Sequence, residues 1–101
     1  MAVVSISLCK ELQKRSTAGL TARLEKVLSG SLAYGKPVFV AIDVLDLDQP
    51  KASIIMSDFG NIEPLDAETL MGDAHEIVVE YFDLLDRDVR VLMQAELTLK
   101  F

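Results

Sequence analysis

The C-terminal stretch 89–101 is the strongest constraint on the fold of this chain. Its apolar side chains are Val89, Val91, Met93, Ala95, Leu97, Leu99 and Phe101, and they alternate with Arg90, Leu92, Gln94, Glu96, Thr98 and Lys100. A period of two is the signature of a β-strand whose two faces meet different surroundings. The pattern predicts a strand that continues to the last residue, with one face towards a core.

The segment 75–85 is the expected hairpin partner of this strand. A three-residue loop over 86–88 places Leu85, Tyr81, Val79 and Ile77 opposite the apolar positions of 89–97. A two-residue loop sets Glu80 against Met93 and mixes the faces. Because a slip of one residue turns a whole strand over, the longer loop is the better prediction.

A second hairpin is expected from 38–45 and 52–59, joined by the turn 46–51 with Pro50. Both faces of 38–45 are apolar, with Phe39 on one and Val40 on the other. This two-sided pattern predicts a central strand that is covered on both sides.

Helical spacing of Leu20, Leu24 and Leu28 predicts a helix over 10–28 that ends at Ser29-Gly30. Ser16 or Thr17 could instead be the N-cap of a shorter helix. Residues 2–8 fit either a strand or a first helical turn. A short helix over 66–71 is expected to follow Pro64, with Gly72 as its stop.

Together these elements predict one α+β domain over residues 1–101. An N-terminal helix packs on a four-stranded, mainly antiparallel sheet built from two hairpins, with a short helix between them. Half of the residues are hydrophobic, and a chain of this length leaves part of its apolar surface outside. We therefore expect a homo-oligomer, a dimer or higher, with another protein as a possible further partner.

The charges are divided unevenly along the sequence. Residues 1–40 carry six basic and two acidic side chains, a balance of +4, and residues 41–101 carry four basic and fourteen acidic ones, a balance of −10. The two balances add up to the net charge of −6. This division favours docking of the basic helix against acidic strands, within one chain or between two.

Several classes of partner and compartment are disfavoured. No apolar run approaches the roughly 20 residues of a membrane span, and the N-terminus does not read as a secretion signal. The acidic pI of about 4.6 argues against binding to nucleic acid. The single cysteine, Cys9, favours a reducing compartment, so a cytoplasmic protein that binds neither membrane nor nucleic acid is expected.

Two groups of polar residues are candidates for chemistry. Asp43, Asp46 and Asp48 crowd the end of one predicted strand, with Asp58 across the turn, and carboxylates suit calcium or magnesium. Their spacing matches no calcium loop. His75 is the only histidine and has no second histidine or cysteine nearby, so no metal, cofactor or catalytic residue is assigned.

The acidic run of Asp83, Asp86 and Asp88, with Glu76 and Glu80 before it, resembles the charge pattern of a protein that imitates DNA. Arg87 and Arg90 interrupt the run, which favours an ordinary solvated face.

The second face of the predicted C-terminal hairpin has the composition of an interface. It offers an apolar centre with a charged rim, and the residues assigned to it are Val78, Phe82, Leu84, Leu92, Arg90 and Gln94. The alternative is that the N-terminal helix simply covers this face.

The sequence therefore favours a small non-enzymatic interaction or structural module, an accessory, chaperone-like or assembly component that binds a copy of itself or another protein. The alternatives are an acidic DNA-mimic inhibitor, or a small ligand- or metal-binding enzyme that uses Asp43, Asp46, Asp48 and His75.

Overall fold

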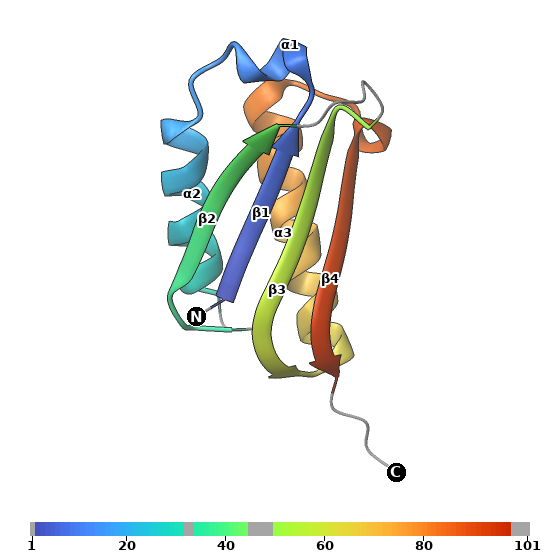
Figure 1. Cartoon of the computed structure of the whole chain (residues 1–101). Coiled ribbons are helices and arrows are strands. Elements are labelled where there is room, and N and C mark those ends of the chain that lie inside the picture. The colour runs from blue at the N-terminus through green and yellow to red at the C-terminus, as the bar shows by residue number, and fades with distance from the viewer. Residues whose placement is uncertain (1, 32–33, 45–49, 98–101) are drawn as a thin grey trace.

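The computed structural model describes residues 2–31, 34–44 and 50–97. Figure 1 shows four strands and two long helices. Along the chain these are β1 (Ala2–Leu8), the short α1 (Lys10–Gln13), α2 (Ala18–Ser29), β2 (Val38–Val44), β3 (Ala52–Ile62), α3 (Pro64–Phe82), the 3₁₀ turn η1 (Asp86–Asp88) and β4 (Val89–Leu97).

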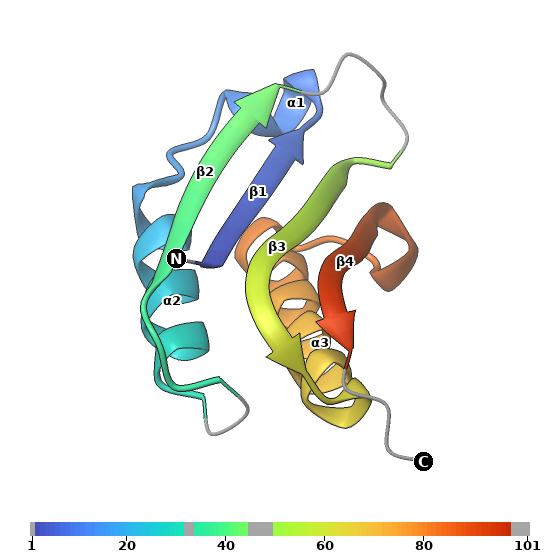
Figure 2. The ribbon, with the colours of Figure 1, turned by 60° about the horizontal axis from the view of Figure 1, so that its bottom comes forward.

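The four strands form one sheet in the order β2-β1-β3-β4. β1 pairs with β2 in parallel, β3 pairs with β4 in parallel, and the inner pair β1–β3 is antiparallel. A parallel pair requires a long crossover, which α2 supplies in the first half and α3 in the second. The chain is thus two successive βαβ units joined side by side along β1 and β3 (Figure 2).

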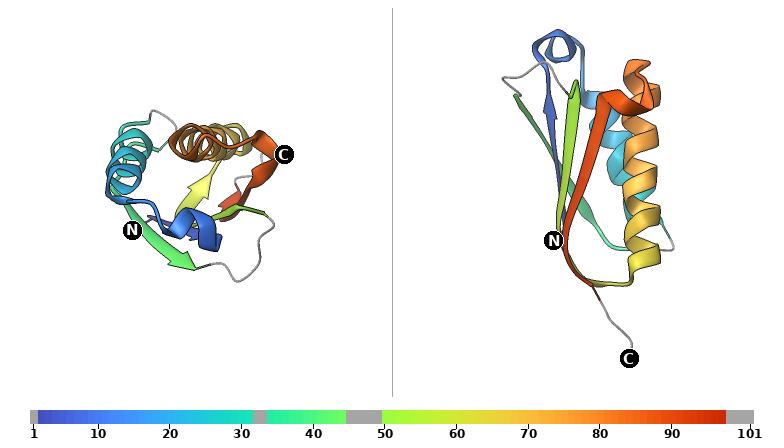
Figure 3. Two further views of the ribbon diagram at one scale, coloured as in Figure 1. Left: turned by 90° about the horizontal axis from the view of Figure 1, so that it is seen from above. Right: turned by 90° about the vertical axis from the view of Figure 1, so that its right-hand side faces the viewer.

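Both long helices lie on the same face of the sheet, as the edge-on and end-on views of Figure 3 show. The alternation of β1 explains this, because Val4, Ile6 and Leu8 are fully buried while the residues between them are only partly so. The buried side of α2 consists of Leu20, Leu24 and Leu28, at the spacing of one helix face. Burial of these apolar side chains is the main stabilising term of the fold.

Among the described residues, no helix covers the opposite face of the sheet (Figure 3). We call it the uncovered sheet face. It comprises Val3, Ser5, Ser7, Phe39, Ala41, Asp43, Ser53, Ile55, Ser57, Arg90, Leu92 and Gln94, which alternate with the core residues and align across the strands. Phe39 is 53% exposed, Leu92 45% and Ile55 37%. Three large apolar side chains of this face are therefore open to solvent.

The sequence prediction was wrong about residues 64–85. A single helix, α3, replaces the expected short helix and the expected strand over 75–85. Its buried residues are Ala67, Leu70, Ala74, Ile77, Val78 and Phe82, which lie three or four positions apart, apart from the adjacent Ile77–Val78 pair. The expected C-terminal hairpin therefore does not exist, and β4 follows a helix rather than a strand.

The expected hairpin of 38–45 with 52–59 is also wrong, because β1 lies between β2 and β3. The sheet is mixed rather than mainly antiparallel. The chain does not begin with a helix, because residues 2–8 form an inner strand of the sheet. β2 is an edge strand rather than a central one. The apolar residues on its second face belong to the uncovered sheet face, where Phe39 is exposed.

Some local predictions hold. The strand at 89–97 and a strand that begins at 52 are present. The break before Ala18 places the N-cap of α2 at Thr17, one of the two residues named for this role. Residues 98–101, with Leu99 and Phe101, lie outside the described residues.

Two leucines of α3 test this packing. Leu70 is fully buried and Leu65 is 75% exposed, so Leu70→Ala should lower the free energy of unfolding by about 2–5 kcal/mol. Leu65→Ala should change it by less than about 0.5 kcal/mol. Urea unfolding of both variants measures the difference. Equal losses would contradict the placement of α3 on the sheet.

Candidate functional site

Strand β3 contains an irregularity at residues 58–60. Its antiparallel pairs with β1 end at Val3–Ser57, and its pairing with β4 is interrupted between Ser57 and Asn61. Asp58 has a φ of 61° and Gly60 a φ of 72°, both in the left-handed region. A bulge of this kind re-aims side chains and is common beside functional sites.

The bulge directs Phe59 inwards, where the side chain is only 4% exposed. Its ring meets that of Tyr34, with centroids 4.8 Å apart and planes tilted by 55°. Tyr34 belongs to the connection between α2 and β2. This tilted geometry is a favourable one for two aromatic rings, and it ties the loop before β2 to the bulge in β3.

The loop before β2 also supplies a cation. Gly35 has a φ of 69° and turns the chain so that Lys36 and Pro37 follow directly before β2. The Lys36 Nζ lies 6.0 Å from the centroid of the Tyr34 ring. At this distance the attraction between ammonium and ring is weak but favours the observed position of the charge.

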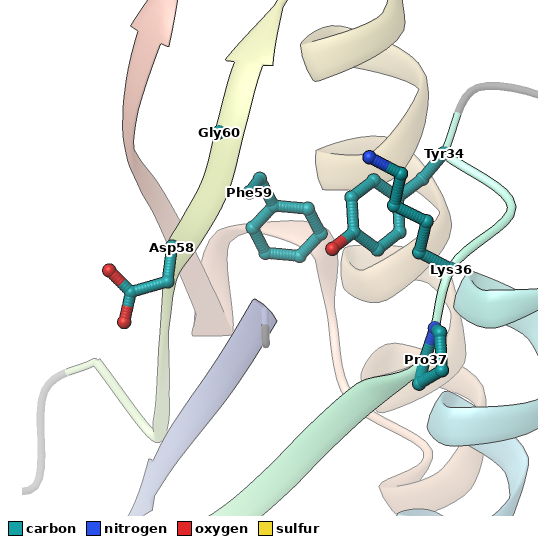
Figure 4. A pocket seen from close by; sticks show the side chains of 6 residues that line it. All are labelled: Tyr34, Lys36, Pro37, Asp58, Phe59 and Gly60. Atoms are coloured by element: carbon teal, nitrogen blue, oxygen red, sulfur yellow. The ribbon is translucent and has the colours of Figure 1, made fainter.

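These residues surround an open cavity of about 370 Å³, lined by Tyr34, Lys36, Pro37, Asp58, Phe59 and Gly60, which we call the Phe59 hollow. Figure 4 shows Phe59 and Tyr34 at its centre and Pro37 at its side. The Lys36 side chain lies on the Tyr34 side of the Phe59 ring, and the Asp58 carboxylate lies on the other side and points away from it.

The Phe59 hollow has the chemistry of a site for a small anion with an apolar part. Of its described lining residues, Lys36 alone is positively charged, and an ammonium group is a donor to carboxylate or phosphate oxygens. The Phe59 and Tyr34 rings supply apolar surface, and the Tyr34 hydroxyl is a further hydrogen-bond group. Apolar walls with a few polar groups are typical of small-molecule sites.

The structure does not bring the predicted acidic and histidine residues together. Asp43 lies on β2, Asp58 in the bulge of β3 and His75 on α3, while Asp46 and Asp48 lie outside the described residues. The His75 Nε2 is 2.9 Å from the carbonyl oxygen of Asp86, a contact between α3 and η1. Within the described residues no group of three or more His, Cys, Asp or Glu side chains is placed to hold a metal ion.

The acidic residues between positions 76 and 88 have different structural roles. Glu80 on α3 forms an exposed ion pair with Arg23 on α2, 2.8 Å long. The Asp88 carboxylate accepts a hydrogen bond from the backbone N–H of Leu85, 3.0 Å long, and closes the turn before β4. Asp83 ends α3 in the left-handed conformation. These residues do not form one continuous strand face, because they belong to a helix and a turn.

The predicted interface residues fall on two different surfaces. Val78 and Phe82 are buried in the core by α3, and Leu84 packs against that core. Arg90, Leu92 and Gln94 lie together on the uncovered sheet face. A role in association stays a prediction for the second group, whereas Val78 and Phe82 are not accessible to a partner.

Sequence reasoning missed Tyr34, Lys36, Phe59 and Gly60. The sequence pattern places residues 34–37 in the loop before the strand at 38 and Gly60 just after the strand-like run 52–59, and it marks neither as part of a site. The available signal was the glycine that follows an aromatic residue inside a strand-like run, which suggests a bulge. Nothing in the pattern indicated that the loop before 38 faces residue 59.

Among the described helices, none combines the length and the apolar character needed to cross a bilayer.

Comparison with solved structures shows which fold this is. Pt0534, solved after inactivation by 2-oxo-3-pentynoate, superposes with a TM-score of 0.69 at 16% identity, covering 94% of this chain and 86% of that one. Macrophage migration inhibitory factor from Oncomelania hupensis gives 0.72 at 13% identity, covering 94% and 73%. Native fused 4-OT gives 0.66 at 18%, covering 98% and 90%. The chain has the fold of these proteins.

No protein-family model and no curated protein matches the chain. The likeness is therefore one of fold.

The comparison overturns the prediction of a non-enzymatic interaction or structural module. The fold is one that enzymes use, since another neighbour is N1, a member of the cis-3-chloroacrylic acid dehalogenase family, with a TM-score of 0.62 at 18% identity, covering 92% of this chain and 73% of that one. The mixed sheet of this chain, which superposes on these neighbours, also overturns the expected two-hairpin fold.

Two of the solved neighbours are described as trimers. A fused 4-OT is described as an asymmetric trimer, and it covers 98% of this chain at a TM-score of 0.63.

Two glycines test the shape of the bulge. Gly60→Ala should lower the free energy of unfolding by about 1 kcal/mol, because alanine is strained at a φ of 72°. Gly72→Ala, in the middle of α3, should raise it by about 0.5–1 kcal/mol because alanine is the better helix former. A Cβ at either position meets no atom within 4 Å, so thermal unfolding compares backbone effects alone. A stabilising Gly60→Ala would contradict the left-handed bulge.

Proposed function

We propose that this protein is an enzyme that binds a small 2-oxo carboxylic acid in the Phe59 hollow and catalyses its keto–enol interconversion. The observation that carries the proposal is the Lys36 ammonium beside the aromatic pair of Tyr34 and Phe59, at the bulge of β3.

Lys36 would hold the substrate carboxylate. The side chain is exposed at the rim of the hollow, so it can reach a bound anion without the cost of burying an unpaired charge. The cavity of about 370 Å³ suits a molecule of a few carbon atoms. The apolar part of the substrate would lie against the partly exposed Tyr34 ring, which is backed by Phe59.

The same geometry favours enolisation. In a 2-oxo acid the ketone oxygen is adjacent to the carboxylate, so an acid held at Lys36 keeps that oxygen within the field of the ammonium. When the C3 proton passes to solvent, the electron pair of the C–H bond forms the C2–C3 double bond, and negative charge develops on the ketone oxygen, which then takes up a proton from solvent to give the enol. A positive charge fixed near that oxygen stabilises the enolate more than the ketone, which lowers the barrier.

The neighbours' names support this class of ligand. One is inactivated by 2-oxo-3-pentynoate, a 2-oxo acid, and another belongs to a family that acts on cis-3-chloroacrylic acid. Both compounds are short carboxylic acids. The tautomerase-like fold of the 4-OT and migration inhibitory factor neighbours is consistent with the reaction.

Exchange of the C3 protons of 2-oxopentanoate in D₂O, followed by proton NMR, tests the proposal. The wild-type protein should accelerate the loss of the C3 signal over buffer, and Lys36→Ala should reduce this acceleration about tenfold or more, because a charged hydrogen bond to the substrate is lost. Lys36→Arg should retain part of it.

Lys26→Ala, an exposed lysine of α2, is the matched control and should exchange at the wild-type rate. An exchange rate equal to that of heat-denatured protein, or one that is insensitive to Lys36→Ala, would refute the proposed function.

The protein would also associate with copies of itself through the uncovered sheet face. Phe39 on β2 and the paired Ile55 and Leu92 on β3 and β4 are exposed apolar side chains of this face, and β2 and β4 are both unpaired edges within the described sheet. An apolar centre bordered by polar residues such as Arg90 and Gln94 has the composition of an interface. The trimer described for fused 4-OT supports self-association.

Leu92→Asp should weaken this association at least about tenfold, because it places a charge beside the exposed Ile55 on the apolar part of this face. Leu65→Asp, on the exposed start of α3, should leave association unchanged. Sedimentation velocity over a range of concentrations measures both variants. A wild-type protein that sediments as a monomer at high micromolar concentration would refute self-association.

A further inference from the structure

We infer that the protein forms a two-fold dimer in which the uncovered sheet faces of two copies pack against each other, with β2 of one copy over β4 of the other. This inference rests on the self-association proposed above and specifies its geometry. It comes from the order in which charged, polar and apolar side chains cross the face.

The uncovered sheet face consists of three rows of side chains, each of which crosses the strands from β2 to β4 through paired positions. The two ends of every row differ in chemistry. In the strand order β2-β1-β3-β4, the first row is Asp43, Ser7, Ser53 and Arg90, the second is Ala41, Ser5, Ile55 and Leu92, and the third is Phe39, Val3, Ser57 and Gln94.

The charges of this face lie at opposite ends of the first row. Of the residues that define the face, Asp43 and Arg90 are charged, and both are exposed. Three inter-strand spacings of about 4.8 Å place the backbones of β2 and β4 about 14 Å apart. The face therefore has a negative and a positive edge at the same height along the strands, which makes it complementary to a second copy of itself.

A two-fold axis parallel to the strands uses this complementarity. Such an axis turns the second sheet over onto the first, reverses the order of its strands and leaves each row at its own height. Asp43 of each copy then lies opposite Arg90 of the other copy, so two ion pairs form in every dimer. Aligned sheets pack about 10 Å apart, a distance that an arginine and an aspartate side chain can bridge.

The same axis brings the large apolar side chains of the face together with small or flexible ones. Leu92, which is 45% exposed, comes to lie over the small Ala41 of the other copy. Phe39, which is 53% exposed, comes to lie over Gln94 and next to Leu92. Removal of these apolar surfaces from water in both copies supplies the non-directional part of the binding energy.

An axis perpendicular to the strands is disfavoured by the charges. It places every strand over the same strand of the other copy. If the axis crosses the first row, Asp43 faces Asp43 and Arg90 faces Arg90. If the axis crosses the second row, Asp43 faces Phe39. Like charges that are brought together, and a charge that is buried against an apolar ring, both oppose association.

The size of the face determines the strength of the contact. The face is open in the described structure, because both long helices lie on the other side of the sheet (Figure 3). Each copy contributes twelve residues to it, whereas a standard stable interface takes roughly 20–30 residues from each side. We therefore expect a weak dimer that forms in the micromolar range.

Exchange of the charges between two variants tests this geometry. Asp43→Lys and Arg90→Glu are measured alone and in an equimolar mixture, by sedimentation velocity of the full chain at several concentrations. Each variant alone places like charges opposite each other at both ends of the first row, so its dimer dissociation constant should rise at least about tenfold. In the mixed pair every cation meets a carboxylate, and the constant should return to within about threefold of wild type.

Arg23→Glu and Glu80→Lys are the matched controls. They make the same changes of net charge at the exposed ion pair between α2 and α3, on the helix side of the sheet. Each should dimerise as the wild type does, alone and in the mixture. All four altered side chains are exposed, so the variants should retain the fold.

The outcomes separate the geometry from self-association as such. If Leu92→Asp weakens association but the mixture of charge variants stays as weak as each variant alone, the two-fold arrangement is refuted while association through this face stands. A wild-type assembly of three copies also refutes it. If the wild-type protein stays monomeric at high micromolar concentration, the proposed self-association fails together with the inference.

Discussion

The antiparallel pairing of β1 with β3 is the contact on which the rest of the structure depends. Each βαβ unit has only two strands, and a two-stranded sheet is marginally stable at best by itself. Joining the units along β1 and β3 makes one sheet and places α2 and α3 side by side on it. The leucines of α2 and the buried side of α3 then share a single core.

The same pairing determines where the candidate site lies. β3 extends beyond its last pair with β1, Val3–Ser57. Past this point β3 has no β1 partner, and the bulge at Asp58–Gly60 occurs there. The loop that leads into β2 reaches the same end of the sheet, because β2 runs parallel to β1. Lys36 and Phe59, 23 positions apart in the sequence, become neighbours through the order of the strands.

This order explains how much could be predicted from the sequence. The strand at 89–97 and the buried leucines of α2 follow from local periodicity, which depends on the chain alone. The strand predicted over 75–85 is wrong because two patterns overlap there. Ile77, Val79 and Tyr81 alternate as in a strand, while Leu70, Ala74 and Ile77 fit a helix equally well. Gly72 is typical of a helix end and therefore favoured the strand. No local sequence pattern indicates that β1 lies between β2 and β3. The Phe59 hollow was missed for that reason, since its walls come from segments that only the sheet order brings together.

The strand order also affects how the chain folds during synthesis. The N-terminal unit is complete once β2 has been made, but the inner edge of β1 stays unpaired until residues 52–62 follow. Until then an apolar strand edge is open to pairing with other chains. Contacts between segments so distant in sequence form slowly. Ser5 and Ser7 lower the apolar character of one side of this temporarily exposed strand. They therefore make β1 less prone to aggregate before β3 has been synthesised.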